Sequence, residues 1–246
     1  MKAFQWLLDQ LFPNKCAGCG KVEQSGICES CYSKLPFVGR NACPRCGREK
    51  KWCWCGRKPV GAERPIPMPG YQQLTAPFYY EGLSRDAIGH LKFRHQRYHA
   101  RWLGAEMAAK IREQMDVSMI DAVVPVPLSA GRMRERGFNQ AALLAKEISD
   151  SLGIACREEL LQKVKESRIQ HTLTRAQRMQ NAEGAYFADK AAAGLRILLI
   201  DDISTTGATL ESCAKTLTLA GAEAVVCCAA AVTKWENEEV KIESKQ

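Results

Sequence analysis

Eight of the twelve cysteines lie between Cys16 and Cys55 and are arranged in pairs. The pairs are Cys16/Cys19, Cys28/Cys31, Cys43/Cys46 and Cys53/Cys55. A C-x-x-C turn places two sulfurs on one side of a tight loop, and two such pairs complete the tetrahedral four-cysteine site that zinc prefers. The cysteines therefore predict two structural zinc sites. An iron–sulfur cluster is the alternative, since it also binds four thiolates.

The spacing leaves open how these cysteines are grouped. Consecutive grouping places Cys16, Cys19, Cys28 and Cys31 at one site and Cys43, Cys46, Cys53 and Cys55 at another. Crossed grouping is also compatible with the spacing, and the last pair, with one intervening residue instead of two, is the weakest ligand pair. The remaining cysteines differ, because Cys213, Cys227 and Cys228 lie in apolar stretches and are expected to be small core residues.

A second chemical signal lies in residues 196–210, RILLIDDISTTGATL. An apolar strand is predicted to end in Asp201 and Asp202, and a short loop rich in Thr and Gly then leads into a helix. A helix N-terminus offers backbone N–H groups and positive partial charge, which suit a phosphate. Carboxylates beside a phosphate would repel it unless they bind neutral groups such as ribose hydroxyls and a divalent ion nearby offsets the charge. The alternative is an ordinary capped helix, but the fixed Asp-Asp and Thr-Thr-Gly-x-Thr spacing favours a binding loop.

A basic segment follows another predicted strand, in residues 124–140, VPVPLSAGRMRERGFNQ. Arg132, Arg134 and Arg136 are expected on a loop next to Gly137. The planar guanidinium group can bind two phosphate oxygens at once, so arginines at the end of a strand suit a pyrophosphate. A solvated entry to a helix is the alternative for these arginines.

Hydrophobic periodicity predicts the elements that position these residues. Strands are expected over 76–80, 120–126, 197–200 and 224–232, and helices over 84–93 with Ser84 as N-cap, 99–115, 138–152 and 208–220 with Gly221 as C-cap. Strand, helix and strand at the C-terminal end form a right-handed βαβ unit. The fold class is therefore α/β with a mostly parallel sheet, preceded by a small zinc-ribbon domain.

The composition excludes several classes of protein. Hydrophobic residues make up 46% and charged residues 25%, which excludes a disordered chain, a fibrous protein and a coiled coil. A membrane span is not expected, because the longest apolar run, 224–232, is far shorter than the roughly 20 residues that a bilayer requires. Residues 1–12 are typical of a short amphipathic helix and not of an export signal, so a cytoplasmic location is expected.

Residues 1–75 hold twelve Lys or Arg and five Asp or Glu, as well as Trp52 and Trp54. This basic excess raises the alternative of a nucleic-acid contact. Thiolates around zinc add negative charge, so part of the excess balances the metal sites.

The Asp201–Thr209 loop resembles the binding loop for phosphoribosyl pyrophosphate in the type I phosphoribosyltransferase family. Three further stretches indicate a particular family with this loop: R-x-R-G-F-N-Q at 134–140, Lys92-Phe93, and residues 165–173. In the last stretch, Lys165 and Ser167 replace the usual Arg and Thr. Together with the cysteine pairs, they make the chain similar to the ComF family. These are competence-associated proteins with a double zinc ribbon before a phosphoribosyltransferase domain.

The resemblance implies residue roles. It implies Asp201 and Asp202 as catalytic residues at the ribose hydroxyls, with Mg²⁺ accompanying phosphoribosyl pyrophosphate. The other residues implied at that ligand are Ser204, Thr205, Thr206, Gly207, Ala208, Thr209, Arg132, Arg136 and Lys92. The Pro-rich stretch over 56–69 is expected to be a linker, which places the domain boundary near residue 70. The expected domains are residues 1–70, with an N-terminal helix, the double zinc ribbon and the Pro-rich linker; residues 71–235, like a phosphoribosyltransferase; and a charged tail, 236–246.

The implied activity is phosphoribosyl transfer to an unknown acceptor in the setting of DNA uptake. A polar, basic loop over 163–178 is expected to close over the ligand. Two alternatives are a non-catalytic sensor of phosphoribosyl pyrophosphate or a nucleotide, and a competence factor that handles single-stranded DNA through the zinc module. Partner proteins of the competence machinery are a further expectation.

Overall fold

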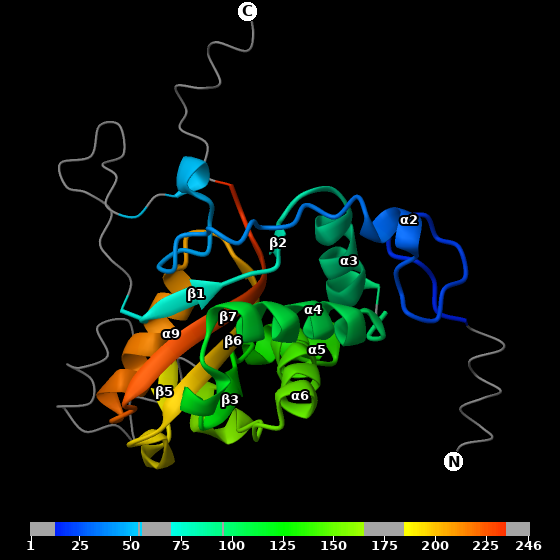
Figure 1. Cartoon of the computed structure of the whole chain (residues 1–246). Coiled ribbons are helices and arrows are strands. Elements are labelled where there is room, and N and C mark those ends of the chain that lie inside the picture. Colours follow the sequence, from blue (N-terminus) through cyan, green and yellow to red (C-terminus); the bar gives the residue numbers. More distant parts are fainter. Residues whose placement is uncertain (1–12, 54, 56–69, 95, 165–184, 235–246) are drawn as a thin grey trace, which may run out of the picture.

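The computed structural model describes residues 13–53, 55, 70–94, 96–164 and 185–234. Its main sheet has five strands, and every pairing in it is parallel. The strand order is β1 (Gln73–Thr75), β7 (Ala224–Val232), β6 (Arg196–Ser204) and β3 (Ala122–Pro125), and β2 (Phe78–Tyr79) also pairs with β7. The predicted α/β class with a mostly parallel sheet is confirmed (Figure 1).

The C-terminal βαβ unit consists of β6, α9 (Ala208–Leu219) and β7, as predicted. Strand β6, however, does not end before the two aspartates, because β7 extends to Val232 and supplies ladder partners as far as Ser204. Asp201 and Asp202 therefore lie inside a strand, which fixes their backbone. The predicted C-cap of α9 was one residue too late: Ala220 is the C-cap, and Gly221 follows it with a φ of 97°.

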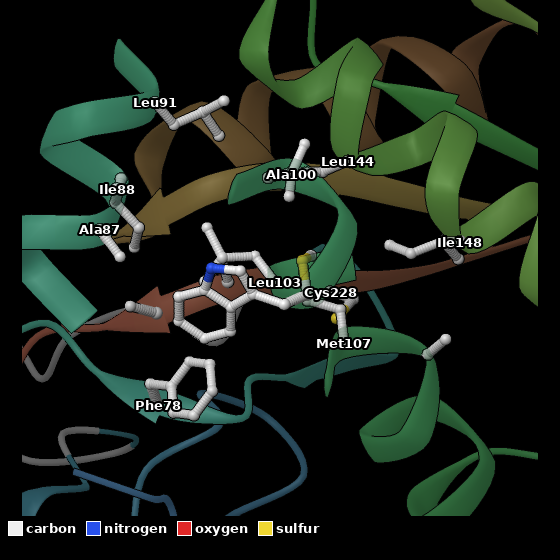
Figure 2. Close-up of a cluster of buried hydrophobic side chains, with 14 of the residues drawn as sticks. Phe78, Ala87, Ile88, Leu91, Ala100, Leu103, Met107, Leu144, Ile148 and Cys228 are labelled. Carbon is white, nitrogen blue, oxygen red and sulfur yellow. The ribbon is translucent and has the colours of Figure 1, made fainter. Parts of the chain in front are cut away.

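Two buried clusters occupy the two faces of the sheet. Alternate residues of β6 and β7 point to opposite faces, so Leu198 and Cys228 belong to one cluster and Leu199 and Cys227 to the other. On the first face lie α3 (Gly82–Phe93), α4 (His99–Gln114) and α6 (Gln140–Leu152), whose side chains surround Cys228 in Figure 2. On the second face lies α9, which contributes Cys213 and Leu217. The three cysteines predicted for the core are buried.

The first helix of the α/β region begins earlier than predicted. Its N-cap is Glu81 and not Ser84, which is the third residue of the helix and accepts a hydrogen bond from the backbone N–H of Glu81 at 3.3 Å. The hydroxyl therefore does serve the helix start, but from inside the helix.

The smaller elements carry little hydrophobic periodicity and were not predicted. They are α2 (Glu29–Tyr32), α5 (Ala130–Arg136), the antiparallel pair β4 (Leu161–Lys163) and β5 (Tyr186–Ala188), and single 3₁₀ turns at Lys50–Trp52, Val117–Met119, Glu158–Leu160 and Lys190–Ala192.

Several predicted features lie outside the described residues. They are the N-terminal helix, the Pro-rich linker, nearly all of the expected loop over 163–178, and the C-terminal tail. Within the part of the chain that is described, no helix is both long enough and apolar enough to cross a bilayer.

Candidate functional site

A cavity of about 400 Å³ lies at the carboxyl ends of β3 and β6, where parallel sheets bind their ligands. Seven of the predicted site residues line it: Lys92, Arg132, Arg136, Asp201, Asp202, Thr205 and Thr209. The other four, Ser204, Thr206, Gly207 and Ala208, line a smaller cavity of about 30 Å³, which Asp201, Thr205 and Thr209 also border. The structure thus gathers all of the predicted ligand-binding residues around two cavities with shared walls.

The loop between β6 and α9 depends on one glycine. Gly207 has a φ of 81°, a left-handed conformation that residues with a Cβ rarely adopt, and α9 begins at the next residue. The N–H of Ala208 donates to Thr206 Oγ1 at 3.4 Å. The loop therefore turns the chain sharply into the N-terminus of a helix, whose partial positive charge favours an anion.

The two aspartates have different environments. Asp202 is 7% exposed, and both of its carboxylate oxygens are engaged: Lys92 Nζ lies 2.8 Å from Oδ1, and Gln140 Nε2 donates to Oδ2 at 2.9 Å. Asp201 is only partly buried, and its Oδ1 accepts the backbone N–H of Asp202 at 2.8 Å. Asp201 thus has the more accessible carboxylate of the two.

The surroundings of Asp201 also change its protonation. Burial, and next the charge of Asp202, raise the pKa of Asp201 to about 8, while Lys92 and Lys163 act in the opposite direction. This shift favours the protonated form of Asp201, which can donate as well as accept a hydrogen bond.

The arginines after β3 lie on a short helix, α5, and not on the predicted loop. Ser129 caps this helix by accepting the N–H of Arg132 at 3.3 Å, and Gly137 ends it with a φ of 70°. Arg132 and Arg136 are one turn apart, so both line the cavity, whereas Arg134, between them, does not. Arg136 Nε is buried without a hydrogen-bond partner among the described residues, so it is a donor available to an anion.

The R-G-F-N-Q motif gains a structural explanation. Asn139 caps α6: its Oδ1 accepts the N–H of Ala141 at 3.0 Å, and its Nδ2 donates to the carbonyl of Val126 at 3.0 Å. The next residue, Gln140, holds Asp202. The sequence drew attention to this motif, but its role toward Asp202 is visible only in the fold.

Lys163 and Tyr186, from the β4–β5 pair, also line the cavity. Lys163 Nζ lies 3.4 Å from the Tyr186 hydroxyl and 5.0 Å from the centre of its ring. Burial, and next the proximity of Cys213, raise the pKa of Tyr186, so its hydroxyl stays protonated. The sequence did not single out either residue, although Lys163 is the first residue of the loop expected over 163–178.

His99 is a core residue and not a candidate acid or base. Trp102 Nε1 can only donate, and it donates to His99 Nδ1 at 3.2 Å, so the ring proton lies on Nε2, which bonds Gln96 Oε1 at 3.1 Å. Burial, and next the proximity of His90, lower the pKa of His99 to about 4. His95 and His171 lie outside the described residues.

The eight clustered cysteines form two groups in consecutive order. The sulfurs of Cys16, Cys19, Cys28 and Cys31 lie within 4.8 Å of one another, as do those of Cys43, Cys46, Cys53 and Cys55. The Cys16–Cys28 and Cys46–Cys53 sulfur distances are 3.7 and 3.6 Å. A tetrahedron with the usual zinc–sulfur bond has edges of about 3.8 Å, so both groups fit zinc.

The two cysteine groups contact different parts of the α/β domain (Figure 1). Beside the first group, the Tyr32 hydroxyl donates to Glu106 Oε1 on α4 at 2.9 Å. Beside the second group, Leu74 of β1 donates its N–H to the carbonyl of Pro44 at 2.8 Å, and Arg48 donates to the carbonyl of Thr233 at 2.6 Å. The second group therefore lies near the end of β7 and the loop that follows β6.

Comparison with known proteins agrees with this architecture. Residues 7–63 match the model of the double zinc ribbon domain family. The class defined by the fold and the cysteines is thus a double zinc ribbon followed by a parallel α/β domain.

Curated relatives extend the match to most of the chain. The DNA utilization protein YhgH of Escherichia coli K12 is 29% identical over 81% of this chain and 87% of its own length. Competence protein F of Haemophilus influenzae is 27% identical over 85% and 92%, and competence protein ComFC of Bacillus subtilis is 29% identical over 81% of each chain. The resemblance to the ComF family that the motifs indicated is confirmed.

Solved structures with some likeness include glutamine phosphoribosylpyrophosphate amidotransferase from B. subtilis. It is 21% identical, with a TM-score of 0.39, over 53% of this chain and 26% of that one. Purine phosphoribosyltransferase from Pyrococcus horikoshii is 16% identical, with a TM-score of 0.34, over 55% and 83%.

Proposed function

We propose that the chain binds phosphoribosyl pyrophosphate in the 400 Å³ cavity and transfers its phosphoribosyl group to an acceptor that is still to be identified. The observation that carries the proposal is the convergence of three elements on one space. Strand β6 brings Asp201, the start of α9 brings Thr209, and α5 brings Arg132 and Arg136. A sugar carrying phosphates at both ends needs such a set of groups.

The groups that line the cavities suit the different parts of phosphoribosyl pyrophosphate. The loop from Thr205 to Thr209 and the N-terminus of α9 would bind the 5-phosphate. Asp201, with the accessible carboxyl group, would bind the ribose hydroxyls. Arg132 and Arg136 would bind the pyrophosphate, for which the unpartnered Nε of Arg136 is a suitable donor.

In the transfer, the bond between the anomeric carbon and the pyrophosphate oxygen breaks, and its electron pair leaves with the pyrophosphate. An acceptor nitrogen forms the new bond and loses a proton. The arginines would stabilise the negative charge that develops on the leaving group. Mg²⁺, for which Asp201 offers a carboxylate oxygen, would supply further charge neutralisation when bound with the substrate.

The names of the relatives suggest the biological setting. Two are named competence proteins and one a DNA utilization protein. We therefore place the proposed activity in DNA uptake and natural transformation.

Calorimetry with phosphoribosyl pyrophosphate and Mg²⁺ tests the binding site. Asp201→Asn and Arg136→Met should each weaken binding by about tenfold or more, since the first removes the carboxyl group proposed for the ribose hydroxyls and the second removes a charge-assisted contact. Matched controls are Asp150→Asn, on the exposed side of α6, and Arg134→Met, on the exposed side of α5. Equal affinity in the site variants and the controls would contradict the site, and no binding by the parent chain would contradict the function.

Turnover is tested separately, by release of pyrophosphate in a screen of purine, pyrimidine and amine acceptors. Release that depends on one acceptor supports the transferase. Tight binding without release for any acceptor would instead favour the non-catalytic sensor.

A second candidate function, the binding of single-stranded DNA, is favoured by a surface beside the cavity and not by the zinc module. Phe93 is 64% exposed, and the Arg136 guanidinium lies 5.1 Å from the centre of its ring. Arg94 and Arg97, which lie close to Phe93 in the sequence, are also exposed. Aromatic rings beside basic groups stack bases and bind the phosphate backbone.

For this candidate we expect that Phe93→Ala weakens binding of a labelled oligonucleotide by about fivefold or more, and that affinity falls steeply with salt. Met119→Ala, an exposed apolar residue at the opposite end of the sheet, is the matched control. An unchanged affinity of Phe93→Ala for the oligonucleotide would exclude this surface. Loss of binding only in variants of the zinc module would show that the zinc module binds the DNA.

A further inference from the structure

Arg48 connects the second cysteine group to the loop that begins the proposed phosphate site. It is two residues after Cys46, and its side chain is buried, with 1% exposure. Its backbone belongs to the cysteine turn, because the carbonyl of Arg48 accepts the N–H of Cys43 at 2.7 Å. Any change in the geometry of this turn therefore moves the side chain.

The guanidinium group donates to carbonyl oxygens from three segments. It reaches Cys46 at 2.9 Å, Thr233 at 2.6 Å, and the consecutive residues Ser204 and Thr205 at 3.2 and 2.5 Å. Ser204 and Thr233 follow Arg48 in the sequence by 156 and 185 positions. Arg48 thus ties the cysteine turn to the start of the loop after β6 and to the end of β7.

These bonds fix the orientation of two peptide groups in the loop. A trans peptide is planar, so the N–H of the following residue points opposite to the carbonyl. Because the carbonyls of Ser204 and Thr205 point at Arg48, the N–H groups of Thr205 and Thr206 point away from it. Arg48 itself is not among the described residues that line either cavity, so it acts from behind the loop.

We propose that Arg48 is a positioning residue, which couples the metal-bound form of the second cysteine group to the orientation of the 204–209 loop. Its guanidinium holds the peptide groups and adds a fixed positive charge behind them, both of which favour an anion in the loop. The ligand class is a phosphate monoester, so this inference rests on the proposed function for its ligand. The orienting effect on the loop exists without any ligand and can be measured alone.

The local sequence explains why an arginine can reach this place. Gly47 has a φ of 67°, and a Cβ there would lie 3.2 Å from the carbonyl oxygen of Leu74. Glycine therefore allows the cysteine turn to approach β1 closely. The next side chain then enters the gap between the ends of β6 and β7.

The test compares Arg48→Met with Arg45→Met in the full chain. Arg45 belongs to the same cysteine turn but is exposed, so it is the matched control. Three quantities are measured: zinc per chain by elemental mass spectrometry, hydrogen exchange of the 204–209 segment without ligand, and affinity for phosphoribosyl pyrophosphate with Mg²⁺ by calorimetry.

We expect Arg48→Met to keep its zinc, to exchange the loop amides about tenfold faster or more, and to bind the ligand about tenfold more weakly or worse. Arg45→Met should match the parent chain in all three. Equal loop exchange in the two variants would overturn the proposal. If the parent chain binds no phosphoribosyl pyrophosphate, the proposed function fails, while the exchange experiment still decides the role of Arg48.

If Arg48→Met does not fold, Arg48→Lys replaces it in the same experiment. An ammonium group keeps the charge but lacks the planar fork that bonds several carbonyls at once. Loop exchange should then be faster than in Arg45→Met, with zinc retained. Parent-like exchange in Arg48→Lys would show that charge alone suffices, and would overturn the orienting role.

Discussion

Lys92 and Asp202 form a nearly buried ion pair in the lining of the cavity, with Lys92 Nζ 2.8 Å from Asp202 Oδ1. The side chains are 13% and 9% exposed. The pair joins the end of α3 to the C-terminal part of β6, and Gln140 of α6 completes the partners of the carboxylate. A charge buried to this degree is tolerated only while its partners remain.

Lys92→Met should therefore destabilise the protein by about 3 kcal/mol, because it leaves Asp202 buried without its counter-charge. Urea unfolding at pH 7 measures the loss. The double variant Lys92→Met with Asp202→Asn should recover most of it, since a neutral amide no longer needs the ammonium group. If the lysine substitution costs the same in the Asp202→Asn chain, the pair does not stabilise the fold.

The raised pKa of Asp201 makes a prediction about pH. Between the usual carboxyl pKa and about 8, the native state holds a proton at Asp201 that the unfolded state has lost, so stability falls as pH rises through this window. Asp201→Asn removes this contribution. The free energy of unfolding of the variant, relative to the parent, should increase steadily from pH 5 to pH 8. A constant difference across this range would show that Asp201 is ionised in the native state.

The buried His99 has the opposite dependence. Its folded pKa of about 4 lies below the unfolded value of 6.5, so below pH 6.5 the unfolded state binds a proton that the native state does not. Stability should fall by about 2 kcal/mol between pH 7 and pH 5 from this residue alone. His99→Gln, which keeps an acceptor for Trp102, should lose that part of the dependence. Parallel curves for the parent and this variant would contradict a neutral, buried ring.

Much of the α/β region could be predicted from apolar periodicity, because its strands are buried on both faces and its long helices on one. Strand β7 has the predicted bounds, and the βαβ unit follows from it. The grouping of aspartates, threonines and arginines around one cavity also agrees with the motifs, since parallel strands bring their carboxyl ends to one edge.

The rest depends on contacts between residues that are distant in the sequence. No local pattern shows that Gln140 and Lys92 occupy the carboxylate of Asp202, or that Lys163 and Tyr186 form a wall of the cavity. The short helix α5 was not predicted, because its sequence shows no repeat of apolar residues that would indicate a buried helix face. The sequence does not distinguish Arg48 from the other arginines. Its role is visible only in the fold, where three segments surround its buried side chain.

The two cysteine groups should differ in their effect on the ligand. Cys53→Ser removes a ligand of the second group, whose turn carries Arg48, whereas Cys19→Ser removes a ligand of the first group, which packs beside α3 and α4. We expect Cys53→Ser to bind one zinc fewer and to lose about tenfold or more in affinity for phosphoribosyl pyrophosphate with Mg²⁺.

Cys19→Ser should also lose one zinc but keep an affinity within about twofold of the parent, because nothing described in the first group touches the 204–209 loop. Zinc content and calorimetry on the two variants, at a temperature at which circular dichroism shows both folded, separate a specific coupling from general weakening. Similar losses of affinity in the two variants would mean that zinc acts through overall stability. A loss confined to Cys53→Ser would place the coupling in the turn that carries Arg48, because that turn alone of the two meets the carbonyls of Ser204 and Thr205.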